Sequence, residues 1–256
     1  MGAYREVFQR KEIKYLLNGE QYEGILRYLH TIAKEDEYGQ SRINNIYYDT
    51  PDFQLIRTSL EKPVYKEKLR LRTYGETKDG TNAFLEIKKK YDGIVYKRRI
   101  SGSYNRLQEY MNGGKTAFDD SQIAKEIRAF REFYKDLRPA MCICYERVAM
   151  AGIYDPDFRV TFDTKIEWNT QCSDLREIRS GKPLLRPDEC LMEIKAANAF
   201  PLKLARQLSE WEIFPASFSK YGAGYTEMIQ TANMGNAAEN RNVRNIRYRK
   251  GEMAYV

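Results

Sequence analysis

The sequence predicts an α+β fold built on an antiparallel sheet or barrel, and three observations lead to this prediction. Many segments alternate apolar and polar residues with a period of two, which is typical of strands with one buried face. Helical patterns are inserted between groups of these segments and do not follow each one, which argues against repeated βαβ units. The chain has 256 residues, of which 42% are hydrophobic, so it can bury a substantial core.

The strands are predicted from alternation and from the turns that end them. Thr50-Pro51-Asp52 is a turn signal after the second strand, and Asp92-Gly93 is a favourable turn dipeptide between the fourth and fifth. In chain order, the predicted strands are 4–17, 42–49, 67–74, 83–90, 94–101, 141–149, 159–167 and 190–196.

The helices are predicted from caps and from helical spacing. Asn18 is a candidate N-cap with Gln21 three residues later, and Ile123, Ile127 and Phe130 recur at the spacing of one helix face. In chain order, the predicted helices are 18–33, 53–58, 105–111, 121–137, 201–214 and a last one after Ser219.

Composition bounds the domains and the class of protein. Residues 1–232 are predicted to form one domain, and residues 233–256, rich in Asn and Arg, a loosely ordered basic tail. The net charge of +7 favours anionic partners. Nucleic acid is not expected among them, because no recognition helix, RNP motif or glycine-rich loop is present. Signal-peptide and membrane-span patterns are absent, so we expect a cytosolic protein; peripheral attachment through a membrane-protein partner is the alternative.

Histidine and cysteine usage disfavours several kinds of site. His30 is the only histidine and lies in a predicted helix, which disfavours catalysis that depends on a histidine base. No Cys-x-x-Cys pair exists, so a zinc site is not expected. The four cysteines are expected to be reduced and to fill the core, without a bridge; they are Cys142, Cys144, Cys172 and Cys190.

Side-chain parity gives the strands one apolar and one charged face. In the most basic strand, Lys68, Arg70 and Arg72 share one face, and Leu69 and Leu71 share the other. One such face could simply be solvated, but the pattern recurs along the chain. We therefore expect a closed barrel whose apolar faces pack outward under helices and whose charged faces line the lumen. Arg and Lys there match phosphate oxygens, and the scattered carboxylates suit a divalent metal.

Nine segments carry these faces in order, from about residue 4 to 230. They are 10–15 (RKEIKY), 47–51 (YYDTP), 68–72 (KLRLR), 84–88 (FLEIK), 97–99 (KRR), 145–147 (YER), 159–163 (RVTFD), 192–195 (MEIK) and 217–221 (SFSKY). Together they resemble the VTC domain, the polyphosphate polymerase domain of the vacuolar transporter chaperone family, within the CYTH or triphosphate tunnel metalloenzyme group. The resemblance implies a closed antiparallel β tunnel flanked by helices. It also implies an ATP:polyphosphate phosphotransferase that moves the ATP γ-phosphate onto a growing polyphosphate chain and releases ADP, with Mn²⁺ or Mg²⁺ as cofactor.

The resemblance also assigns roles to individual residues. The implied catalytic cations are Lys14, Arg70, Arg72, Lys88, Lys97, Arg147 and Arg159. Lys220, Ser219 and Tyr145 would contact the substrate, and Glu193 would hold the metal. Parity adds further substrate-binding candidates, which are Arg10, Lys68, Arg99 and Lys195.

The first strand departs from the wider group. Many relatives begin with Glu-x-Glu-x-Lys, whereas this chain has Arg10-x-Glu12-x-Lys14. Loss of the first acid disfavours two-metal hydrolysis and favours binding of a phosphate chain. Two alternatives remain: a tunnel-type hydrolase of triphosphate or of nucleoside triphosphates, and a non-catalytic module that binds polyphosphate.

Overall fold

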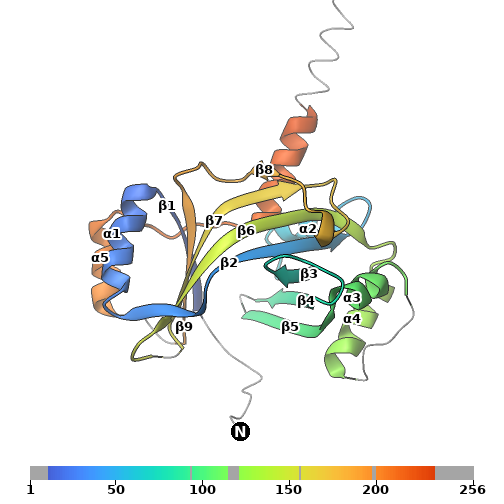
Figure 1. Cartoon of the computed structure of the whole chain (residues 1–256). Helices are drawn as coiled ribbons and strands as arrows, with labels where there is room; N and C mark the ends of the chain where they lie inside the picture. The colour runs from blue at the N-terminus through green and yellow to red at the C-terminus, as the bar shows by residue number, and fades with distance from the viewer. Residues whose placement is uncertain (1–10, 93, 115–120, 156, 198–199, 234–256) are drawn as a thin grey trace, which may run out of the picture.

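The structure, a computed structural model, describes residues 11–92, 94–114, 121–155, 157–197 and 200–233 and is built on one antiparallel sheet (Figure 1). The strand order is β1-β9-β7-β6-β2-β3-β4-β5, and the short β8 pairs with β7. The strands are β1 (Lys11–Leu17), β2 (Ala33–Asp49), β3 (Tyr65–Tyr74), β4 (Asn82–Tyr91), β5 (Ile94–Ser103), β6 (Arg138–Gly152), β7 (Arg159–Asn169), β8 (Lys182–Pro183) and β9 (Cys190–Ala196). Arg10 and residues 234–256 of the predicted tail lie outside the described residues.

Helices flank this sheet, which confirms the α+β class. Asn18 and Gln21 form the predicted capping box at the start of α1. The helices are α1 (Gly19–Leu29), α2 (Gln54–Leu60), α3 (Tyr104–Met111), α4 (Gln122–Phe133), α5 (Leu202–Glu210), the 3₁₀ turn η1 (Leu175–Glu177) and a helix over residues 220–233. None of the helices in the described ranges is both long and apolar enough to cross a bilayer.

Strand β2 begins at Ala33, nine residues before the predicted start. Residues 33–41 are mostly polar and show no clean alternation, so no strand was predicted there. They pair with β6, from Ala33 opposite Gly152 to Ser41 opposite Arg147, with a register shift between Glu35 and Gln40. This ladder is largely exposed, and backbone pairing sustains it with little apolar burial.

The prediction of a closed barrel was wrong. In the described part of the chain β1 and β5 are the two ends of the sheet and do not pair. The free edge of β1 is covered by residues 215–219, called here the seam segment. Ala216 N–H donates to the Lys14 carbonyl at 2.7 Å, and Lys68 Nζ of β3 donates to Ser219 Oγ at 3.0 Å. The seam segment thus lies between β1 and β3, and it satisfies the edge that closure would have paired.

The outer face of the sheet packs under helices, as predicted. One apolar cluster joins β2, β3, β4 and β5 to α3 and α4, with Leu71, Leu85 and Ile127 fully buried. A second joins β1, β7 and β9 to α1 and α5, with Ile25, Val160 and Leu204 fully buried. Figure 1 shows the two helix pairs at opposite ends of the sheet.

The inner face is only partly charged. A third apolar cluster covers part of β2, β6 and β7 and includes Met141 and Trp168, with Tyr221 from helix 220–233 packed on it. The helix approaches closely, because a Cβ atom on Gly224 would lie 2.6 Å from Met141 Sδ and 3.3 Å from Trp168 Cβ. Helix 220–233 therefore covers the apolar part of the inner face, and its first residue, Lys220, meets the charged part.

A disulfide joins Cys142 of β6 to Cys172, so the prediction that all four cysteines are reduced was wrong. The loop after β7 returns over the outer face of β6 and brings the two Cα atoms to 5.8 Å. A sequence separation of 30 gives no local sign of this approach. Cys144 and Cys190 are buried and free.

Candidate functional site

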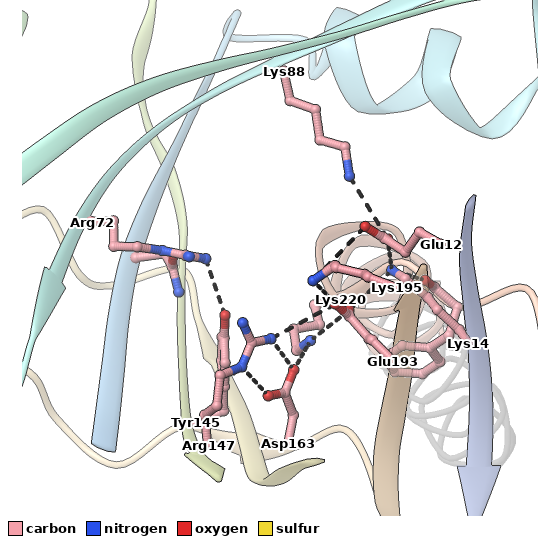
Figure 2. A network of polar contacts seen from close by, with 12 residues as sticks. Glu12, Lys14, Arg72, Lys88, Tyr145, Arg147, Asp163, Glu193, Lys195 and Lys220 are labelled. Atoms are coloured by element: carbon pink, nitrogen blue, oxygen red, sulfur yellow. Dashed lines mark hydrogen bonds and ion pairs between the residues drawn. The ribbon is translucent and has the colours of Figure 1, made fainter. Parts of the chain in front are cut away.

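Glu193 on β9 lies at the centre of the first cation cluster on the inner face (Figure 2). Its carboxylate oxygens lie 3.2 Å from Lys195 Nζ, 3.4 Å from Lys14 Nζ and 3.6 Å from Lys220 Nζ. Arg147 Nη2 lies at 3.9 Å. Burial raises the pKa of Glu193, but the surrounding cations outweigh it and hold the pKa well below its ordinary value. Glu193 is therefore ionised.

Asp163 on β7 fixes the next pair of cations. Its fully buried carboxylate accepts two hydrogen bonds from Arg147, at 2.5 and 2.7 Å, and one from Lys220 Nζ at 2.5 Å. Burial lowers the pKa of Lys220, but Asp163, Tyr145 and Glu193 raise it above its usual value. Asp163 ends the segment 159–163 but was not among the predicted site residues.

Glu86 on β4 holds a separate set of cations on the neighbouring strands. Its side chain is 1% exposed and lies 2.7 Å from Arg70 Nη2 and 2.5 Å from Lys97 Nζ. Burial raises the pKa of Glu86, and Arg70, Arg72 and Lys97 more than offset that, so its pKa lies below the ordinary range. Desolvation of the Lys97 amine beside this carboxylate lowers the pKa of Lys97 to about 8, although the charge of Glu86 opposes the shift.

Tyr145 on β6 links these sets. Its hydroxyl accepts a hydrogen bond from Arg72 Nη2 at 3.0 Å. The guanidinium carbon of Arg147 lies 5.3 Å from the ring centroid, and Lys220 Nζ lies 4.5 Å from it. Arg72 and Arg147, from strands apart in the sheet order, therefore converge on one phenol ring (Figure 2).

Two lysines of the inner face bond the seam segment through neutral oxygens. Lys14 Nζ donates to the Phe218 carbonyl at 2.9 Å, and Lys68 Nζ donates to Ser219 Oγ at 3.0 Å. Lys68 forms no ion pair with a carboxylate in the described ranges. Burial lowers its pKa to about 8. The charge of Lys68 is thus incompletely balanced, which leaves room for an added anion.

The remaining predicted cations differ in their surroundings. Lys88 Nζ on β4 lies 4.0 Å from Glu12 Oε1 on β1. Arg99 is exposed, and its guanidinium carbon lies 4.5 Å from the Phe84 ring centroid. Arg159 is exposed at the edge of the array, opposite Lys195 in register.

Several polar residues on this face were not among the predicted site residues. Thr161 lies opposite Glu193, and its hydroxyl is buried without a hydrogen-bond partner among the described residues. Tyr47 accepts a hydrogen bond from Arg70 Nη1 at 3.1 Å. Burial raises the pKa of Tyr47, yet Arg70 and Arg72 bring it down to about 8. Parity places Thr161, Glu86 and Glu12 on the charged face, but nothing in the sequence shows which cations the two carboxylates pair with.

A divalent ion fits this face only if the substrate shares in holding it. In the described ranges no three Asp, Glu, His or Cys side chains gather as a metal site. Glu193, Glu12 and the unpartnered Thr161 hydroxyl offer hard oxygen donors, which Mg²⁺ and Mn²⁺ prefer. Lys195 Nζ contacts both carboxylates, at 3.2 and 4.0 Å, so the two acids are near one another. Phosphate oxygens would have to complete the coordination.

Comparison with known proteins adds a family match, two relatives and one solved structure. A family model described as the VTC domain matches residues 9–229. Subunit 4 of the vacuolar transporter chaperone complex of Schizosaccharomyces pombe is 24% identical over 194 residues, covering 64% of this chain and 27% of that protein. Subunit 2 of the same complex from Saccharomyces cerevisiae is 26% identical over 200 residues, covering 68% and 24%.

The chain thus spans about a quarter of the length of these relatives. A solved structure from Bacillus halodurans, described as a candidate adenylate cyclase, covers 84% of this chain and 94% of its own. It has a TM-score of 0.50 at 13% identity, which shows a shared fold.

Proposed function

Because the chain belongs to the VTC domain family, we propose that it is a polyphosphate polymerase that transfers the γ-phosphate of ATP to the end of a polyphosphate chain. One observation carries the proposal. Lysine and arginine side chains converge on one face, where they outnumber the carboxylates that hold them. They come from β1, β3, β4, β5, β6 and β9 and from helix 220–233. Such a face suits a ligand that carries several negative charges in a row.

The proposed reaction is an in-line phosphoryl transfer. A terminal oxygen of the acceptor chain attacks the γ-phosphorus, and the bond from that phosphorus to the β–γ bridging oxygen breaks, so that its electron pair leaves with ADP. The acceptor oxygen is already anionic, so no strong general base is needed. Catalysis then consists of alignment and charge stabilisation.

The chain supplies both through fixed side chains. Asp163 and Glu86 lock Arg147, Lys220, Arg70 and Lys97 in place, so little reorganisation accompanies charge development at the phosphates. We assign Glu193, with Glu12 and Thr161 nearby, to a shared Mn²⁺ or Mg²⁺ position. When bound, the ion supplies neutralisation of phosphate charge.

Partners and location are also proposals. Two relatives are subunits of a vacuolar transporter chaperone complex, so we propose that this chain also acts with a membrane-associated protein partner. ATP and polyphosphate are the proposed small-molecule partners.

The test is to supply ATP and Mn²⁺ and to separate the products by chain length. Long polyphosphate with stoichiometric ADP supports the polymerase, whereas free phosphate with ADP supports the hydrolase alternative. Glu193→Gln should abolish turnover. If the wild-type protein binds tripolyphosphate but turns over neither ATP nor tripolyphosphate, the polymerase is excluded and the non-catalytic module remains.

A further inference from the structure

Tyr74, Phe84 and Arg99 form a cluster on the inner face, called here the aromatic rim. The Tyr74 and Phe84 rings meet edge to face with centroids 5.8 Å apart, and the guanidinium carbon of Arg99 lies 4.5 Å from the Phe84 centroid. Register places all three on the charged side of the sheet. Phe84 pairs with Arg72, Arg99 pairs with Glu86, and Tyr74 lies two residues beyond Arg72 on β3.

Core packing does not account for the aromatic rim. Neither Tyr74 nor Phe84 belongs to any of the three apolar clusters. Tyr74 is 40% exposed, and Arg99 is exposed and forms no ion pair within the described residues. Two aromatic rings and a free guanidinium thus share one accessible surface. Such surfaces bind flat, electron-rich rings by stacking and by cation–π contact.

The aromatic rim is continuous with the phosphate-binding cations. The guanidinium carbon of Arg72 lies 5.9 Å from the Tyr74 centroid, while its Nη2 bonds Tyr145. Lys68, which contacts the seam segment, lies six positions back on β3, about 20 Å away at the usual rise per residue. The aromatic rim therefore lies at the end of the cation array farther from helix 220–233.

We propose that the aromatic rim binds the base of a nucleoside triphosphate whose phosphates lie on Arg70, Arg72 and Lys97. This inference rests on the proposed function, since it needs phosphates in the cation array. It adds a residue set that distinguishes a nucleotide from inorganic triphosphate, because only the nucleotide carries a ring. Phosphate-only ligands occupy the cations and leave the aromatic rim empty.

The experiment measures dissociation constants for the non-hydrolysable β,γ-imido analogue of ATP and for inorganic tripolyphosphate. Tyr74→Ala should weaken binding of the analogue about fivefold or more, the low end of one stacked base, and change tripolyphosphate binding less than twofold. Phe84→Ala should do the same, and Phe84→Tyr should retain affinity. Tyr96→Ala is the matched control, because Tyr96 is 41% exposed on β5 and neighbours the inward-facing Lys97, so its ring lies on the outer face.

Ribose 5-triphosphate, which lacks the base, gives a second readout. It should bind the wild-type protein and Tyr74→Ala equally. The proposal is overturned if the wild-type protein binds tripolyphosphate but Tyr74→Ala weakens binding of the ATP analogue and of tripolyphosphate equally. It is also overturned if Tyr74→Ala weakens binding of neither. Unchanged tripolyphosphate affinity also shows that each variant is folded. If tripolyphosphate fails to bind the wild-type protein, the proposed function itself falls, and the base site with it.

Discussion

Lys88 Nζ on β4 lies 4.0 Å from Glu12 Oε1 on β1, although these strands stand near opposite ends of the sheet order. The sheet must therefore curl until its two ends face each other. Side chains and the seam segment then join what backbone pairing does not. This curl turns basic strand faces toward a common space, where each cation acts on the same ligand.

Removal of one inward cation should weaken binding of tripolyphosphate. Arg72 is 4% exposed and held by Asn45 and Tyr145, so its guanidinium is already oriented. Arg72→Ala should raise the dissociation constant at least about tenfold, since a hydrogen bond to a charged group contributes roughly 1.5–3 kcal/mol. Calorimetric titration at two salt concentrations measures the change and should show a smaller salt slope.

The control for this variant is another arginine that faces outward. Arg98 on β5 pairs with Glu126 of α4 at 3.1 Å. Arg98→Ala should leave tripolyphosphate affinity nearly unchanged. Equal losses in Arg72→Ala and Arg98→Ala would mean that binding follows net charge and not the inner face.

Neutralising Glu86 should destabilise the ligand-free protein. Its side chain is 1% exposed and stands between Arg70, Arg72 and Lys97, so Glu86→Gln leaves these cations without a counter-charge. The free energy of unfolding in urea should fall by about 3 kcal/mol. Tripolyphosphate should restore more stability to this variant than to the wild type, because the anion replaces the lost charge. A wild-type midpoint in Glu86→Gln would contradict the charge balance described here.

The sequence predicted which side chains share a face, because parity within a strand is a local property. Lys68, Arg70 and Arg72 alternate with Leu69 and Leu71, and the structure places both sets as that alternation requires. What joins the two ends of the sheet was not predictable in the same way. The seam segment and the cover of helix 220–233 depend on contacts across some 200 residues, such as Lys14 with Phe218.

The buried carboxylates show the same limit. Asp163 follows Val160 and Phe162 in a pattern that fixes its face but not its partners. Its bonds to Arg147 and Lys220 come from β6 and from helix 220–233. The sequence shows that Asp163 is an acidic residue on a charged face. Only the three-dimensional structure shows which cations its carboxylate holds in place.

The Cys142–Cys172 disulfide should be measurable directly. In denaturant without reductant, only Cys144 and Cys190 should react with a thiol reagent, and all four after reduction. Cys172→Ser should lower the free energy of unfolding by about 3.6 kcal/mol, as expected for a closed loop of this size. Reductant should not lower the free energy of unfolding of this variant any further. If all four thiols react without reductant, the disulfide is absent and the expectation of four reduced cysteines is correct.

Binding of tripolyphosphate should weaken as pH rises from about 7 to 9. Burial lowers the pKa of Lys68 to about 8, and burial likewise lowers that of Lys97 to about 8 although Glu86 opposes it. An anion stabilises the protonated amine, so the bound state has the higher lysine pKa and takes up protons near pH 8. Tyr47 acts in the same direction, because its pKa of about 8 makes it anionic above that pH.

The contribution of Lys68 is separated from the others by Lys68→Met. Each titrating amine adds at most a tenfold loss of affinity per pH unit above its pKa, so this variant should bind more weakly at pH 7 but with a shallower pH slope. Titration of tripolyphosphate itself is common to both proteins and cancels in the comparison. Calorimetry in buffers of different ionisation enthalpy should show fewer protons taken up by the variant. Lys165→Met, at an exposed lysine paired with Glu146, should keep the wild-type slope; equal slopes in Lys68→Met and the wild type would remove Lys68 from the anion site.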